Sequence, residues 1–241
     1  LTEQIQSEGW RAYTLGVLAP HLADNLLSQA LKLTEQIQSE DHRAAALCGL
    51  SPHLPKGLLP QALQLTEQIL DESRKAQALS GQATHQPALV PQILKLVKQF
   101  QSESIRSDVL RGLAPHLSDK FVSQALKLTD QIRDEDDRAY VLEKLALHVP
   151  DDFVSQTLKL TEQIQDGYVR AGILRKFLPR LHLETADFST WCKLLRELTY
   201  LNRQDLLESL PQLALAILHL GNEETLRHVV ATIDDVCEQW P

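Results

Sequence analysis

Five of the nine histidines recur every 31 or 32 residues, a pattern that could align imidazoles as metal ligands. Two imidazoles on one zinc ion must each lie about 2.1 Å from it, whereas packed helices lie about 8–10 Å apart. The spacing therefore argues against a metal site, and we expect no metal or other cofactor. We interpret these side chains as donors to the last carbonyls of helices. The series comprises His21, His53, His85, His116 and His148, with Arg180 in the sixth position.

A second basic series has the same spacing, and acidic residues precede most of its members, as Glu40 and Asp41 precede Arg43. The structural interpretation is a set of ion pairs within or between helical hairpins. The functional alternative is a line of guanidinium groups that binds an acidic partner. The series comprises Arg11, Arg43, Lys75, Arg106, Arg138 and Arg170.

Sequence patterns of enzymes are absent. The chain has no Gly-rich phosphate loop, no His-Glu-x-x-His and no Gly-x-Ser-x-Gly, and no pattern sets a nucleophile against a base. The acidic run at residues 134–137 is typical of a solvated helix start. Cys48, Cys192 and Cys237 lack metal-binding spacing and fit a reducing compartment. We therefore expect no enzymatic activity and no catalytic residues.

The elements that carry these residues are internal repeats. The sequence Leu-Thr-Glu-Gln-Ile-Gln occurs at residues 1–6 and again at residues 33–38. Equivalent leucines open six copies at Leu1, Leu33, Leu65, Leu96, Leu128 and Leu160. A period of this size is typical of stacked structural repeats. The pattern predicts an all-α fold, a right-handed α-solenoid of about six 32-residue helix-hairpin repeats.

Each repeat is expected to contain two antiparallel helices, because apolar residues recur at three and four positions. The first helix is predicted at residues 24–37 and 152–164, and the second helix at residues 41–54 and 136–148. A small residue three positions before a leucine allows second helices to approach closely. These pairs are Ala12/Leu15, Ala44/Leu47, Ala76/Leu79, Ser107/Leu110, Ala139/Leu142 and Ala171/Leu174.

Two places depart from the repeat. The third repeat has Gln82 and Gln86 at leucine positions and Thr84 at a proline position, so we expect the array to bend or open there first. The period ends near residue 182, which divides the chain into an array at residues 1–181 and a C-terminal helical cap at 182–241. Cap helices are predicted at about 189–198, 203–220 and 223–238, with Asp187 or Ser189 capping the first.

The beginning of the sequence falls inside a repeat. Because Leu-Thr-Glu-Gln-Ile forms the second half of a first helix, the sequence is expected to begin halfway through a helix. With no methionine present, we expect it to be part of a longer protein. An open N-terminal end would expose apolar surface, which predicts self-association there.

Three positions of the second helix, spaced i, i+4 and i+7, vary freely among repeats and share one helix face. The simple interpretation is that they vary because they are exposed. The functional interpretation is a groove for a protein or peptide segment, with Tyr13, Tyr140 and Tyr168 as anchors. The third positions include Gly16, Cys48 and Ser80. The candidate binding residues are Tyr13, Asp41, Gln77, Asp108, Arg111, Tyr140, Glu143, Tyr168 and Arg175.

Composition narrows the function classes. The net charge of −8 counts against binding to a nucleic-acid backbone. Apolar runs are too short to span a membrane, and no secretory leader is found, so we expect a cytoplasmic protein without a membrane partner.

Arg-Ala in the second helix, as at residues 43–44, and Ala-Pro-His-Leu at residues 19–22 and 114–117 carry a resemblance. The chain resembles tetratricopeptide and HEAT-type helical repeats, although its period is 32 and the tetratricopeptide Trp-Leu-Gly-Tyr positions are missing. Together with the C-terminal block from Trp191 to Pro241, it is similar to helical arrays beside NACHT-type ATPases or caspase-like peptidases in large bacterial proteins.

The resemblance implies a non-enzymatic docking or sensing module that binds protein. The alternatives are a regulatory arm that restrains an adjacent effector domain of its own chain, a nucleic-acid-binding repeat, and a structural spacer.

Overall fold

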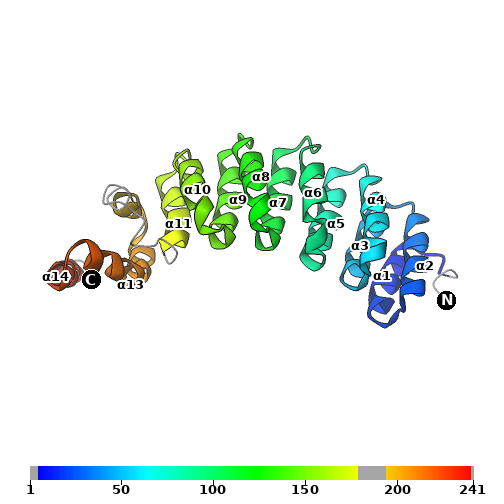
Figure 1. Ribbon diagram of the computed structural model, residues 1–241, viewed down its shortest axis with the longest axis horizontal. Helices are drawn as coiled ribbons and strands as arrows, with labels where there is room; N and C mark the ends of the chain where they lie inside the picture. The colour runs from blue at the N-terminus through cyan, green and yellow to red at the C-terminus, as the bar shows by residue number, and fades with distance from the viewer. Residues whose placement is uncertain (1–4, 179–193, 240–241) are drawn as a thin grey trace. The chain divides into compact units, whose positions relative to one another are not determined.

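The computed structural model describes residues 5–178 and 194–239. Every regular element in this part of the chain is an α-helix or a short 3-10 helix, and no strand occurs in it, so the fold is all-α (Figure 1). The chain divides into two compact regions, Leu1–Pro150 and Asp151–Pro241, which we call the N-terminal and C-terminal regions. The predicted boundary at residue 182 lies outside the described residues, as do residues 1–4 of the half-helix predicted at 1–5, and Ile5 is not helical.

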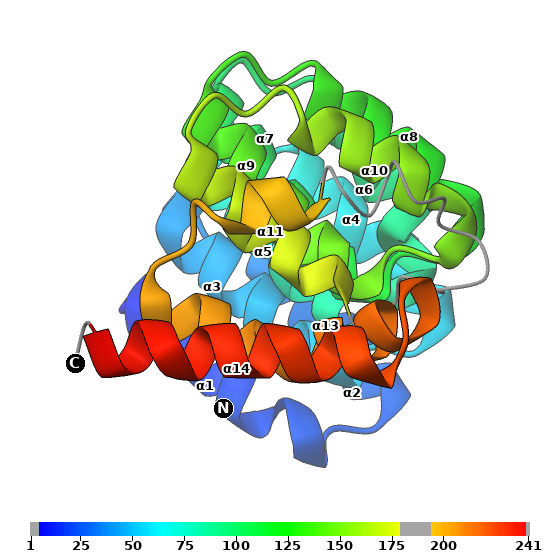
Figure 2. The same cartoon turned by 90° about the vertical axis from the view of Figure 1, so that its left-hand side faces the viewer.

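The N-terminal region alternates the two kinds of predicted helix. The second helices are α1 (Glu8–Leu18), α3 (Glu40–Leu50), α5 (Glu72–His85), α7 (Glu103–Leu113) and α9 (Glu135–His148), and each contacts the next. The first helices are α2 (Asp24–Glu35), α4 (Leu59–Glu67), α6 (Val90–Val97) and α8 (Asp119–Asp130). In Figure 2, α3, α5, α7 and α9 form one layer, and α4, α6 and α8 form the other.

Proline decides where a second helix ends. A proline lacks the N–H that an α-helix interior needs. Where the sequence has Pro20, Pro52 or Pro115, the α-helix stops and a 3-10 turn follows. These turns are η2 (Ala19–His21), η3 (Ser51–His53) and η6 (Ala114–His116). Where Thr84 or Leu147 replaces the proline, α5 and α9 continue to their histidines. The helix predicted at 41–54 ends at Leu50 instead, because Pro52 follows.

The repeated Leu-Thr-Glu-Gln-Ile sequence packs the end of a first helix. Its threonine is fully buried, and the hydroxyl donates to the carbonyl four residues earlier, which satisfies the polar group without a partner from elsewhere. Its isoleucine, as at Ile37, is also buried, just beyond the helix. The threonines that bond in this way are Thr34, Thr66, Thr129 and Thr161.

Two first helices follow short 3-10 turns directly, η4 (Lys56–Leu58) before α4 and η5 (Pro87–Leu89) before α6. Second helices begin at a serine or aspartate whose side chain accepts from an N–H three residues on, a frequent N-cap. These caps are Ser39, Asp71, Ser102 and Asp134. The predicted small-residue and leucine positions are buried in every repeat, so this part of the predicted core is confirmed.

The C-terminal region begins with η7 (Asp151–Phe153), α10 (Val154–Thr161) and α11 (Gly167–Phe177). Residues 194–198 are helical, and α13 (Arg203–Leu220) and α14 (Glu223–Gln239) follow. The predicted helix at 203–220 is confirmed, and that at 223–238 is one residue longer. The predicted caps Asp187 and Ser189 lie outside the described residues. A core joins α11 to this segment and contains Ala171, Leu174, Leu178, Leu194, Leu198, Leu201 and Leu213.

Among the described helices, none has the length and apolarity that crossing a membrane requires.

Candidate protein-interaction site

The arginine series binds backbone carbonyls. Five guanidinium groups each donate to the carbonyl of the residue six positions earlier, at 2.5–3.1 Å, just after the first helix ends. The predicted ion pair with preceding acids is found at Arg106, 3.5 Å from Glu103, but Arg43 binds the Ile37 and Gln38 carbonyls instead. These arginines are Arg11, Arg43, Arg106, Arg138 and Arg170. Each of these guanidinium groups is thus bound to the backbone of its own chain, which favours the structural interpretation of the series.

A glutamate series that the sequence analysis missed connects each repeat to the next. The carboxylate at the first position of a second helix accepts from two successive backbone N–H groups in the following repeat. Glu8, for example, accepts from Gln38 and Ser39 at 2.9 Å each. Glu40, Glu72 and Glu103 do the same at 2.7–3.1 Å. The recurrence of glutamate after the N-cap serine or aspartate was the signal that could have identified it.

These hydrogen bonds stabilise the ionised carboxylates. The backbone N–H donors of the following repeat hold the pKa of Glu8, Glu40 and Glu103 below the ordinary value. Each carboxylate also lies in the first turn of its own helix, where the helix dipole favours negative charge. A glutamate at this position therefore fixes the spacing between adjacent second helices.

Glycines set how closely these helices approach. A Cβ added at Gly49 would lie 2.7 Å from the Cα of Gly16, and one at Gly81 would lie 2.9 Å from the Sγ of Cys48. A Cβ at Gly112 would meet the Oγ of Ser80 at 3.3 Å. Gly16, Cys48 and Ser80 were placed on the variable binding face. In the structure they instead pack against the next helix, and so they vary with the residue that they contact.

One position of each second helix remains open to solvent across the N-terminal region. We call it the exposed row, and it consists of Tyr13, Ala45, Gln77, Asp108 and Tyr140, all exposed. Tyr13 and Tyr140 have 64% and 55% of their surface accessible. A tyrosine ring that can be buried by a partner while its hydroxyl stays hydrogen-bonded is a frequent anchor at interfaces.

The other predicted binding residues of the N-terminal region flank the exposed row. Asp41 forms an ion pair with Arg74 of the next second helix. Arg111 pairs with Asp108 at 2.8 Å, both side chains being largely exposed. Glu143 is partly buried. The structure thus brings Asp108 and Arg111 together and leaves the two tyrosines on separate helices.

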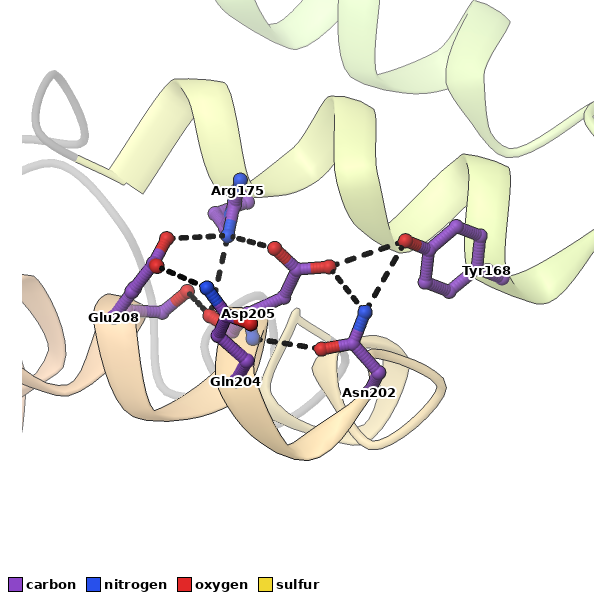
Figure 3. A network of polar contacts seen from close by, with 7 residues as sticks. Tyr168, Arg175, Asn202, Gln204, Asp205 and Glu208 are labelled. Atoms are coloured by element: carbon purple, nitrogen blue, oxygen red, sulfur yellow. Dashed lines mark hydrogen bonds and ion pairs between the residues drawn. The ribbon is translucent and has the colours of Figure 1, made fainter.

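Tyr168 and Arg175 contact the start of α13 (Figure 3). The Arg175 guanidinium lies 2.7 Å from Asp205 Oδ1 and 3.5 Å from Glu208 Oε2. The Tyr168 hydroxyl donates to the other oxygen of Asp205 at 3.1 Å and accepts from Asn202 at 3.3 Å. Asn202 also caps α13 by accepting from the Asp205 N–H. These two predicted binding residues therefore contact side chains of their own chain.

The third repeat replaces leucine by bonded amides. Gln82 is 1% exposed, and its Nε2 donates to the Thr66 hydroxyl at 2.7 Å, while its Oε1 has no partner. Gln86 Nε2 donates to the carbonyls of Ser51 and Leu54 in the preceding repeat. Gln82 thus bonds within the third repeat and Gln86 links it to the preceding repeat, and the opening itself stays a prediction.

No group of three or more His, Cys, Asp or Glu side chains that could hold a metal ion occurs within the described ranges. Four of the five histidines in the recurring series are exposed, and His116 is partly buried.

An open groove of about 370 Å³ between α4 and α6 is lined mainly by Gln64, Glu67, Gln92, Lys95, Leu96 and Gln99.

No protein-family model matches the chain, no curated protein matches it, and no solved structure matches it.

Proposed function

We propose that the chain is a right-handed α-solenoid of about six helix-hairpin repeats that acts as a non-enzymatic protein-interaction scaffold. Its partner is a protein or peptide segment that lies along the exposed row. The succession of contacts from α1 to α9 supports a solenoid, because each second helix packs against the next. The resemblance to arrays beside NACHT-type ATPases and caspase-like peptidases, and the three cysteines without pairing spacing, support a cytoplasmic bacterial protein.

The observation that carries this proposal is that each position of a second helix makes a different kind of contact. Its glutamate binds the next repeat, its arginine binds carbonyls, and its small residues pack on adjacent helices. The exposed row is the position that is exposed in all five second helices and makes none of these contacts, and its residues differ in chemistry from repeat to repeat. A rigid frame with a variable position exposed in every repeat suits recognition of an extended partner.

The test uses peptides selected from a display library on the full chain. Their binding is then measured by fluorescence anisotropy against Tyr13→Ala/Gln77→Ala/Tyr140→Ala. A control variant, Gln29→Ala/Gln64→Ala/Lys127→Ala, changes three exposed residues of first helices. We expect the exposed-row variant to bind at least tenfold more weakly and the control to bind as the parent does, with unchanged circular dichroism. Equal binding by both variants would contradict the proposal.

The regulatory-arm alternative has its own support. Tyr168 and Arg175 bind the chain's own Asp205, so the face that carries them can hold a segment of the same polypeptide. Such an arm would bind a flanking effector domain through the exposed row. Capture of that domain by the parent chain, lost in the exposed-row variant, would distinguish this function from binding of an unrelated partner.

A further inference from the structure

One face of α1 is apolar and exposed, and it is separate from the exposed row. It carries Trp10, Thr14, Val17 and Leu18, which we call the α1 outer face. Trp10 and Val17 are 66% and 53% exposed, and the Trp10 ring meets Tyr13 edge-on at 6.0 Å. The equivalent residues of α3 are His42, Ala46, Gly49 and Leu50. Those residues form the side of α3 that packs on α1, where Gly49 meets Gly16 and His42 meets Gly9.

Beside this face lies a pair of backbone N–H groups that matches the glutamate-binding pairs of later repeats. The N–H groups of Gln6 and Ser7 occupy the place of those of Gln38 and Ser39, which bind Glu8. Within the described residues they have no acceptor. The local sequence is the same, because residues 1–8 and 33–40 both read Leu-Thr-Glu-Gln-Ile-Gln-Ser-Glu.

The backbone at this pair already has the binding conformation. Ser7 has φ −75° and ψ 119°, against −68° and 121° at Ser39. The other glutamate-binding caps, Asp71, Ser102 and Asp134, lie within about 15° of these values. Arg11 holds the loop by donating to the Ile5 carbonyl at 2.8 Å, as Arg43 does at Ile37. A carboxylate can therefore bind there without rearranging the loop.

We propose that the α1 outer face binds an α-helix defined by two of its residues. That helix carries a glutamate at its first position, which binds the Gln6 and Ser7 N–H groups. It carries a small residue eight positions later, where Trp10 and Val17 leave little space. Three of the chain's four helices that bind in this way have a small residue at that place, Glu8 with Gly16, Glu40 with Cys48 and Glu72 with Ser80, whereas Glu103 has Arg111. This site lies beyond the exposed row and accepts a further helix of the repeat type.

The probe is a fluorescein-labelled, lactam-stapled helical peptide with the sequence of residues 72–85, tested against the full chain by anisotropy. A matched peptide carries Glu72→Gln. We expect the glutamine peptide to bind about tenfold more weakly, since a hydrogen bond to a charged acceptor contributes more than one to a neutral acceptor. The variant Val17→Glu should abolish binding, whereas Tyr140→Ala in the exposed row should leave it unchanged.

Ser7→Pro tests the backbone contact directly. Proline removes this N–H, and the φ of −75° already suits proline, while the Ser7 side chain makes no capping bond. We expect circular dichroism to be unchanged and the tenfold preference for glutamate to fall several-fold, because only the Gln6 N–H remains. Equal binding of both peptides to the parent chain, or no binding at all, would overturn the proposal. So would a dimer seen by sedimentation without peptide and lost in Val17→Glu, because a second copy would then occupy the face.

Discussion

The two regions connect successive helices through side chains of opposite charge. In the N-terminal region a carboxylate on one helix binds backbone N–H groups of the following repeat. In the C-terminal region the equivalent first position of α11 is Gly167, against which the Tyr200 ring packs. Cations on α11 make the connection there instead, with Arg170 2.5 Å from Glu197 and Arg175 2.7 Å from Asp205.

This difference decides which kind of contact can recur from repeat to repeat. Every residue except proline offers a backbone N–H, so the glutamate can bind loops as unlike as Gln38–Ser39, Leu70–Asp71 and Arg133–Asp134. An ion pair between two side chains needs one matching partner. The N-terminal contacts therefore tolerate sequence variation from repeat to repeat, whereas the Arg175–Asp205 contact specifies α13 and no other helix.

The largest expected effect on stability comes from a glycine at which two second helices approach closely. Gly49→Ala places a Cβ 2.7 Å from the Gly16 backbone, and we expect it to destabilise the N-terminal region by about 2 kcal/mol. Gly172→Ala, the control on α11, meets nothing within 4 Å. It should stabilise its helix by up to about 1 kcal/mol. Hydrogen exchange followed separately for each region measures both effects, and equal effects of the two substitutions would contradict the close approach at Gly49.

The next prediction concerns the side-chain contact of the C-terminal region. Arg175→Ala leaves the partly buried Asp205 carboxylate without its cation, and we expect a loss of about 2 kcal/mol. The control is Arg111→Ala, whose exposed pair with Asp108 is expected to contribute about 0.3 kcal/mol. Urea unfolding measures both, with hydrogen exchange assigning the loss to a region. Losses of similar size would show that the Arg175 contact has no special role.

Repeat spacing and helical periodicity were enough to predict the all-α fold and the buried alanine and leucine positions. They also placed the two helices of a repeat, with ends displaced by a few residues where proline or a 3-10 turn intervenes. The partners of polar side chains were harder to predict. Arg43 lies three residues after Glu40 in the sequence, yet it binds carbonyls, while Glu40 binds amides 30 and 31 residues away.

The reason is that hydrogen bonds to the backbone leave no complementary side chain in the sequence. The position of Arg175 on a variable face was visible in the repeat, but its partner Asp205 lies beyond the last repeat, where no periodicity indicates the pairing. Likewise, glutamine at a leucine position suggested a weak point, and the sequence did not indicate that Gln86 would bind two carbonyls of the preceding repeat.

The smallest expected effect tests the N-terminal contact through pH. Hydrogen bonds from Asp71 and Leu70 lower the pKa of Glu40 in the folded chain, so folding favours its ionised form. This contribution is complete above the ordinary glutamate pKa of 4.5 and is lost as the pH falls through the lower folded pKa. Glu40→Gln should therefore lower the urea midpoint at pH 7, and the difference from the parent should shrink towards pH 3. Glu35→Gln, which removes an exposed charge at the end of α2, is the control, and a difference for Glu40→Gln that stays constant with pH would contradict the carboxylate–amide contact.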